Sequence, residues 1–334
     1  MAVSFDQLIA RNKRNSWLLI VIFALFVVLV GGTVGYALGL HAGDPELAPH
    51  FAVAATLGAL AVAILSTTVS YYAGANAILA MSRARRIEKR DDPQLYNVVE
   101  EMALAAGVPC PKVYLIDDSA PNAFATGRDP AHGAVAITTG LRDKLTREEL
   151  QGVIAHEIAH IRNYDIRFAV LMATLVGVIV LLCDIFLRSL RWGRWSGGGR
   201  SRRSSKGGGG GAVVLVVVLL ALVLAIVAPI LAKIIEMAFS RQREYLADAS
   251  AVDLTRNPVG LARALMKIRD DPEVLEVANR ATAPMYIVHP IKHFEGRASS
   301  IMDSHPPVEE RIRRLMSLTG AWADGERRAQ GPSI

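Results

Sequence analysis

Two histidines four residues apart, with a glutamate directly after the first, form the stretch with the clearest chemical content, Gln151-Gly-Val-Ile-Ala-His-Glu-Ile-Ala-His160. On an α-helix, residues i and i+4 share a face, with Cβ atoms about 5–6 Å apart. His156 and His160 can therefore each direct a ring nitrogen to one Zn²⁺ ion, at the usual Zn–N distance of about 2.0–2.1 Å. Glu157 would face the open side of the ion and take a proton from the attacking water. The pattern predicts a metalloprotease.

The alternative is an ordinary helix that carries two satisfied histidines and a surface glutamate. With 8 histidines in 334 residues, a random match to His-Glu-x-x-His is expected at roughly one per cent for such a chain. The flanking sequence favours a real, buried helix, because Thr146 and Glu149 have the spacing of a capping box. One side of this helix is apolar, with Leu145, Leu150, Val153, Ile154 and Ile158.

The composition indicates a membrane protein, since 52% of the residues are hydrophobic and only 20% are charged. The apolar residues are concentrated in blocks, and crossing a hydrocarbon core takes about 20 residues. The first block is longer than the apolar region of a typical signal peptide, so we interpret it as a retained anchor. Four blocks are long enough to cross the membrane: residues 17–40, 51–72, 166–187 and 212–239.

The two cysteines and the net charge indicate the redox compartment and the kind of partner. Cys110 lies between two prolines and Cys183 lies inside the third apolar block, so a disulfide is not expected and a reducing compartment fits. The formal net charge is +6. The basic residues of the chain flank the apolar blocks, which favours the lipid bilayer as a partner. They form no aromatic-rich basic patch, which argues against nucleic acid.

Basic residues precede the block at 17–40 and follow the block at 51–72, whereas the connection at 41–50 contains no Lys or Arg. The positive-inside rule then places both ends of this hairpin in the cytoplasm. Residues 82–165, with the predicted zinc helix, should face the cytosol. The basic residues are Arg11, Lys13, Arg14, Arg83, Arg85, Arg86, Lys89 and Arg90.

Between the hairpin and the zinc helix, the sequence predicts a helix at 94–106 and a small antiparallel sheet. An exposed edge strand of such a sheet can bind an extended substrate backbone by β-addition. Asn122, Ala123 and Phe124 are our candidates for this substrate-binding edge; the alternative is a core hairpin with an Asn turn. The predicted strands are residues 112–116, 123–127 and 134–139.

The second half of the site follows the fourth apolar block. Glu244 and Asp248 are four residues apart on a predicted helix, where like charges repel unless a positive group lies beside them. We interpret Glu244 as the third zinc ligand, with the fourth position left for water, and Asp248 as a carboxylate that orients a ligand imidazole. The alternative pairs both acids with Arg241 and Arg243 in solvent.

The C-terminal part is predicted to be helical at 258–269, at 272–283 and after residue 305, with a loop at 284–304 and a loose polar tail from residue 320. His305 precedes two prolines that make the chain rigid. It is therefore a candidate for stabilising the oxyanion formed on the peptide carbonyl. A turn histidine without a role explains the same residues equally well.

Four motifs in this order, behind an N-terminal membrane hairpin, resemble the HtpX family of bacterial membrane-bound zinc endopeptidases. They are Asn122-Ala-Phe-Ala-Thr-Gly127, His156-Glu-Ile-Ala-His160, Glu244-Tyr-Leu-Ala-Asp248 and Ser304-His-Pro-Pro-Val-Glu-Glu-Arg-Ile312. The resemblance covers nearly the whole chain. It departs from the family in the long basic, Gly-rich loop at 188–211, which leaves the topology of the last two apolar blocks open.

The resemblance implies an inner-membrane quality-control protease, active in the stress response, with a cytosolic active site that hydrolyses damaged or misfolded membrane proteins. It implies that His156, His160 and Glu244 bind one Zn²⁺ per chain and that Glu157 is the catalytic base. It also places Asn122 at the substrate-binding edge. His305 would lie at the rim of the active site, and the oligomeric state is left undefined.

Three other functions share part of the pattern. A site-2-type intramembrane protease has His-Glu-x-x-His within an apolar span, whereas here the motif precedes the third block. A CAAX-type prenyl protease would carry more than the four predicted spans. A non-catalytic scaffold with a structural zinc would normally supply a fourth protein ligand.

The sequence therefore predicts a mainly helical α+β membrane protein, with four transmembrane helices and a zincin-like cytosolic protease domain that contains a small antiparallel sheet. The protease domain is expected in two parts, each following a membrane hairpin. The expected divisions are residues 1–81 (first hairpin), 82–165 (first protease part), 166–239 (second hairpin), 240–319 (second protease part) and 320–334 (tail).

Overall fold

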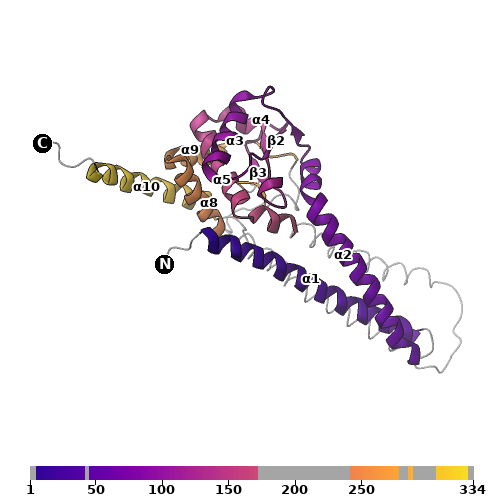
Figure 1. The fold of residues 1–334 in the computed structure, drawn as a ribbon. Helices are drawn as coiled ribbons and strands as arrows, with labels where there is room; N and C mark the ends of the chain where they lie inside the picture. Colours follow the sequence, from indigo (N-terminus) through magenta and orange to yellow (C-terminus); the bar gives the residue numbers. More distant parts are fainter. Residues whose placement is uncertain (1–4, 42–44, 172–240, 278–284, 289–305, 330–334) are drawn as a thin grey trace. The chain divides into compact units, whose positions relative to one another are not determined.

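The computed structural model describes residues 5–41, 45–171, 241–277, 285–288 and 306–329 (Figure 1). The chain divides into two compact units. One unit consists of Met1–Lys13, Tyr71–Val170 and Glu236–Ile334, and the other of Arg14–Ser70 and Leu171–Ile235. Several predicted features lie outside the described residues: His305, the basic loop at 188–211, the apolar block at 212–239 and, apart from residues 285–288, the loop at 284–304. The block at 166–187 is described only as far as residue 171, and residues 165–171 are helical.

Two helices of the described chain are long and apolar enough to cross a membrane. The first is part of α1 (Phe5–His41), and the second is α2 (Ala48–Met81), which follows the short helix η1 (Pro45–Leu47). They coincide with the first two predicted apolar blocks. Four such helices were expected, and the described residues contain these two.

Glycines at four-residue spacing bring α1 close to α2. A Cβ atom added at Gly35 would lie 2.4 Å from the backbone oxygen of Phe51, and one added at Gly39 would lie 2.4 Å from the Cα of Ala48. Only glycine permits such an approach, which is typical of packed helices in membranes. The outer side of α2 exposes large apolar residues, which suits a lipid environment. They include Val53, Leu57, Val62, Ile64, Leu65 and Val69.

The other unit contains a mixed sheet of four strands in the order β1-β2-β4-β3. The pair β2–β4 is parallel, and the pairs β1–β2 and β3–β4 are antiparallel. The prediction of a purely antiparallel sheet was therefore wrong. Strand β4 lies between β2 and β3, and every one of its residues is buried. Strand β3 is therefore at the edge of the sheet. The strands are β1 (Arg85–Arg86), β2 (Lys112–Ile116), β3 (Ala123–Thr126) and β4 (Ala134–Thr138), with the short helix η2 (Pro130–His132) before β4.

Helix α5 (Arg147–Arg162) is the centre of this unit and packs against α3, α8, α9 and the strand β3 (Figure 1). It begins with a capping box, in which Thr146 and Glu149 each bind the other's backbone N–H. Most of its residues from Leu150 to Ile161 are buried. The other helices are α3 (Pro93–Ala106), α4 (Thr139–Lys144), α8 (Arg241–Thr255), α9 (Pro258–Asp270) and α10 (Val308–Ala329).

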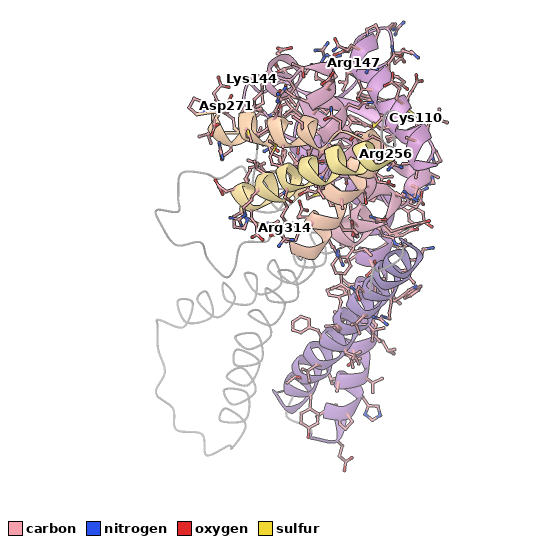
Figure 2. All side chains as sticks on the ribbon, turned by 90° about the vertical axis from the view of Figure 1, so that its left-hand side faces the viewer. Cys110, Lys144, Arg147, Arg256, Asp271 and Arg314 are labelled. Carbon is pink, nitrogen blue, oxygen red and sulfur yellow. The ribbon has the colours of Figure 1, made fainter. Side chains whose placement is uncertain are left out.

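The C-terminal region differs from the prediction in two places. Of the helix predicted at 272–283, residues 272–277 are not helical, and residues 278–283 lie outside the described residues. Asp271 pairs with Lys144 at 2.7 Å (Figure 2) and also accepts the backbone N–H of Glu273, which turns the chain after α9. Pro272 disfavours helical geometry at Asp271, the C-cap residue at which α9 ends. The last helix, α10, continues past Gly320, where a loose tail was expected.

A glycine on α5 sets the distance of this helix from α9 and gives the first testable prediction. A Cβ atom at Gly152 would lie 2.7 Å from the backbone nitrogen and 2.9 Å from the Cα of Leu261. Gly152→Ala should therefore lower the free energy of unfolding by about 1–3 kcal/mol. Chemical denaturation of the purified protein measures this. Gly58→Ala is the matched control because a Cβ there meets nothing within 4 Å. Equal stability of the two variants would contradict the prediction.

Candidate metal centre

His156 and His160 lie one turn apart on α5 with their rings facing each other. Their Nε2 atoms are 3.2 Å apart. Two nitrogens that bind one tetrahedral Zn²⁺ ion at the usual bond length are separated by about 3.3 Å. The spacing of the two rings therefore already fits a shared ion.

Glu244, from the first turn of α8, brings a carboxylate to the same point. Its Oε2 is 3.6 Å from Nε2 of His156, and its Oε1 is 3.5 Å from Nε2 of His160. The three ligand atoms lie within 4.8 Å of one another. Packing of α5 against α8 makes this meeting possible across almost ninety residues of sequence.

The outer nitrogens of both rings are held by carboxylates. Nδ1 of His156 is 2.9 Å from Oδ1 of Asp248, and Nδ1 of His160 is 3.0 Å from Oδ2 of Asp165. An imidazole that donates its Nδ1 proton to such a carboxylate has the lone pair of Nε2 available for a metal ion. Asp248 occupies the position expected from the sequence, whereas the contact of Asp165 with His160 was not anticipated.

The charges around His156 also favour a cation. Burial lowers the pKa of this imidazole, but hydrogen bonds to Asp248 and Glu244 outweigh that effect and raise the pKa to about 9. Without a metal, a proton therefore supplies the positive charge. The surroundings are built to stabilise positive charge at this position.

Glu157 points into the same buried region, and its side chain is 1% exposed. Its Oε1 has no hydrogen-bond partner among the described residues. Burial raises the pKa of this carboxyl above its ordinary value. A buried carboxylate with an open oxygen and a raised pKa suits a group that accepts and returns a proton.

Arg311, from α10, is a site residue that sequence reasoning missed. It is fully buried, and its Nε and Nη2 bind the two oxygens of Asp248 at 2.9 and 2.7 Å. Its Nη1 lies 3.4 Å from Oε2 of Glu244. The residue belongs to a motif noted in the sequence, but only its contacts reveal that it fixes the carboxylate that orients His156.

The predicted substrate-binding edge lies at β3, and the chain itself covers it. The side-chain amide of Asn122 donates to the backbone oxygen of Val288 at 2.9 Å, and the backbone N–H of Ile287 donates to the oxygen of Ala123 at 2.9 Å. Phe124 is fully buried. The edge is thus not exposed in this structure, contrary to our expectation, and its role in substrate binding stays a prediction. So does the role of His305, which lies outside the described residues.

A helix that carries His-Glu-x-x-His, completed by a glutamate from a second helix, defines the site of a metallopeptidase. The comparisons agree. Residues 88–319 match Peptidase family M48. The chain is 46% identical over 315 residues to a "Protease HtpX homolog" of Listeria monocytogenes, covering 94% of this chain and 99% of that one. A "Protease HtpX homolog" of Dictyoglomus thermophilum is 42% identical over 322 residues, 96% of each chain.

The chain therefore belongs to peptidase family M48 and, within it, to the HtpX proteases. It is a membrane-anchored metalloprotease, as the sequence predicted. Among solved structures, it aligns with Ste24p of S. mikatae at a TM-score of 0.43 and 19% identity, covering 90% of this chain and 66% of that one.

The two acidic residues of α8 should respond differently to substitution. Glu244→Ala removes a ligand atom, so the metal and the activity should both be lost. Asp248→Asn keeps the ligands and should reduce activity by about 10–100-fold, as is typical of groups that orient a ligand. Metal analysis and a peptidase assay on the same preparations measure both effects.

Asp253→Ala is the matched control for these two variants, because Asp253 is a solvent-exposed acid on the same helix. It should leave metal content and activity unchanged. Full metal content and parental activity in Glu244→Ala would remove this glutamate from the site.

Proposed function

We propose that this chain is a zinc-dependent endopeptidase that binds one Zn²⁺ per chain through His156, His160 and Glu244. The observation that carries the proposal is the pair of Nε2 atoms 3.2 Å apart, both turned toward the Glu244 carboxylate while their Nδ1 atoms are held by carboxylates. A bound zinc ion would act as a Lewis acid and lower the pKa of a water molecule to about 7.

The residues of the chain provide the rest of the chemistry. Glu157 accepts the proton of the attacking water and passes it to the leaving amine as the peptide bond breaks. Its burial, which raises the pKa of its carboxyl, supports both roles. Asp248 and Asp165 keep the imidazoles in the orientation and tautomer that leave Nε2 free to bind the ion.

The substrate is proposed to be an extended backbone that pairs with β3. Asn122, Ala123 and Phe124 would bind it, since β-addition uses the main-chain groups of an edge strand together with the side chains beside it. His305 is proposed to stabilise the oxyanion at the rim of the site. The geometry of Asn122 supports its role, because its amide already binds a backbone carbonyl.

We further propose that the protein is a multi-pass protein of the bacterial inner membrane with its protease unit in the cytosol. Its substrates would be damaged or misfolded membrane proteins. The two apolar helices and the basic residues at both ends of their hairpin support this orientation. The names of the relatives support proteolysis and say nothing of the substrate.

A non-catalytic zinc scaffold is the main alternative from another class. A structural zinc is normally bound by four protein ligands. In the part of the chain that the structure describes, the cluster of candidate ligands has three members, His156, His160 and Glu244. The open oxygen of Glu157 beside this cluster further favours catalysis. A site-2-type or CAAX-type activity has no observation of its own in its favour.

Replacing Glu157 with Gln tests the catalytic assignment. The ligands remain, so zinc should stay bound, while loss of the proton acceptor should abolish cleavage of an unfolded test protein. The measurement is zinc content beside peptidase activity, with and without a chelator. Glu148→Gln, an exposed glutamate on the same helix, should keep both. Full proteolysis by the zinc-loaded Glu157→Gln variant would end the assignment of this residue as base.

The topology can be tested because the site constrains it. His156 and Glu244 share one site, so the chain between them crosses the membrane an even number of times. Two crossings place the basic loop at 188–211 outside, against the positive-inside rule. No crossing leaves an uninterrupted apolar run without a polar face on the surface. We propose two crossings, because exposing that run costs more than translocating the basic, Gly-rich loop at 188–211.

Ser204→Cys, after Cys110 and Cys183 are replaced by Ser, places a single thiol in this loop. A membrane-impermeant thiol reagent should label it in intact spheroplasts. Labelling that requires permeabilised membranes would show a cytosolic loop and refute the two crossings, while the metal site would stand.

A further inference from the structure

The outer edge of β3 is paired with four residues of the same chain, 285–288. Phe124 and Tyr286 form an antiparallel β-bridge. Beside it, the N–H of Ile287 donates to the oxygen of Ala123 at 2.9 Å, and the amide of Asn122 donates to the oxygen of Val288 at 2.9 Å. The segment therefore uses the same groups that the proposed function assigns to a substrate backbone.

The same segment is bonded to the metal centre. Nη1 of Arg311 donates to the backbone oxygen of Ile287 at 2.7 Å. The guanidinium group also binds Asp248, which holds Nδ1 of His156 at 2.9 Å. One side chain thus joins the backbone of residues 285–288 to the carboxylate that orients a ligand.

Tyr286 fills a side-chain pocket next to β3. It is fully buried, and its ring packs edge-on against Phe124 with 5.1 Å between ring centroids. Its hydroxyl lies 3.4 Å from Oγ of Ser82. Tyr286 belongs to a cluster of buried apolar residues that includes Ile116, Ala136 and Leu275. Such a pocket suits an aromatic side chain that carries one polar atom.

We propose that residues 285–288 occupy the substrate position along β3 and that an incoming peptide displaces them. This inference rests on the proposed function. An extended peptide running antiparallel to β3 offers the same contacts: an N–H for Ala123, a carbonyl for Asn122, and a carbonyl for Arg311. The preferred substrate segment is then unfolded and has an aromatic or large apolar residue at the position of Tyr286.

Displacement has a consequence for affinity. If only the fraction of molecules with an open edge binds peptide, the apparent dissociation constant is raised by the inverse of that fraction. The segment thereby lowers the affinity of the protease for folded proteins and for peptides that pair poorly with β3. The competing explanation is a permanent strand of the sheet, and in that case the peptide binds elsewhere.

The first experiment uses the full-length protein in detergent with Glu157→Gln, so that the peptide is bound without turnover. The probe is a fluorescently labelled, end-capped Met-Tyr-Ile-Val peptide, the sequence of residues 285–288. Adding Tyr286→Ala empties the pocket and weakens the internal strand, so the dissociation constant of the probe should fall about tenfold, or about 1.4 kcal/mol. A Met-Ala-Ile-Val probe should lose most of this gain.

Leu95→Ala, a truncation of an equally buried residue in α3, is the control for general loosening of the fold. It should leave the dissociation constant of the probe unchanged. An unchanged constant in Tyr286→Ala, or equal gains in both variants, would overturn the proposal.

A second measurement needs no substitution in the segment and is made on the same Glu157→Gln protein. The amide of Ile287 is bonded to Ala123, so a saturating probe that displaces the segment should speed hydrogen exchange at this amide at least several-fold. Unchanged or slower exchange with the probe bound would mean a permanent strand and overturn the proposal.

The outcomes separate this inference from the proposed function. Faster exchange and tighter binding in a zinc-loaded protein whose Glu157-containing parent cleaves no peptide would refute the protease function and keep the displaced strand. Cleavage by the parent, with neither exchange nor binding altered, would refute the displaced strand and keep the protease.

Discussion

The structure depends on the balance of charge in the interior of the protease unit. Glu157, Glu244 and Asp248 are buried together, and Arg311 is the buried cation beside them. Three carboxylates and one guanidinium leave an excess of two negative charges, which matches a divalent ion. Without that ion, a proton takes its place: hydrogen bonds to Asp248 and Glu244 outweigh burial and raise the pKa of His156. Buried charges of this kind persist only when they are paired and hydrogen-bonded.

Helix α5 carries the two histidines and is also the most closely packed helix of this unit. Thr146 caps the helix, Gly152 lets α9 approach it, and His156 follows one turn later. The helix is buried on nearly all sides, so the two imidazoles have little freedom to move. Preorganised ligands of this kind lower the cost of binding a metal and of positioning a base.

The sequence was sufficient to predict the parts of the site that depend on local periodicity. The i, i+4 spacing of His156 and His160, the capping box at Thr146 and the strand at residues 112–116 all appear as expected. Pairing between distant segments was not predictable. No local sequence pattern indicates that β4 lies between β2 and β3, or that residues 285–288 pair with β3.

Arg311 shows most clearly why long-range contacts escape a reading of the sequence. Its place in a Glu-Glu-Arg run suggests a solvent-exposed helix surface, and its neighbours Glu310 and Arg314 do form an exposed ion pair. Only the packing of α10 against α8 and α9 turns this one side chain inward. Its partners then come from α8 and from residues 285–288, which are separated from it by more than twenty residues.

A guanidinium group is well suited to this position because its planar fork has five N–H donors. It binds both oxygens of Asp248 with one edge and the backbone oxygen of Ile287 with Nη1. An ammonium group has no such fixed geometry and would have to choose between the two partners. The backbone of Ile287 is therefore connected to the ring of His156 through Arg311 and Asp248. Arg311 thus contacts both the segment that lies along β3 and the carboxylate that orients the imidazole of His156.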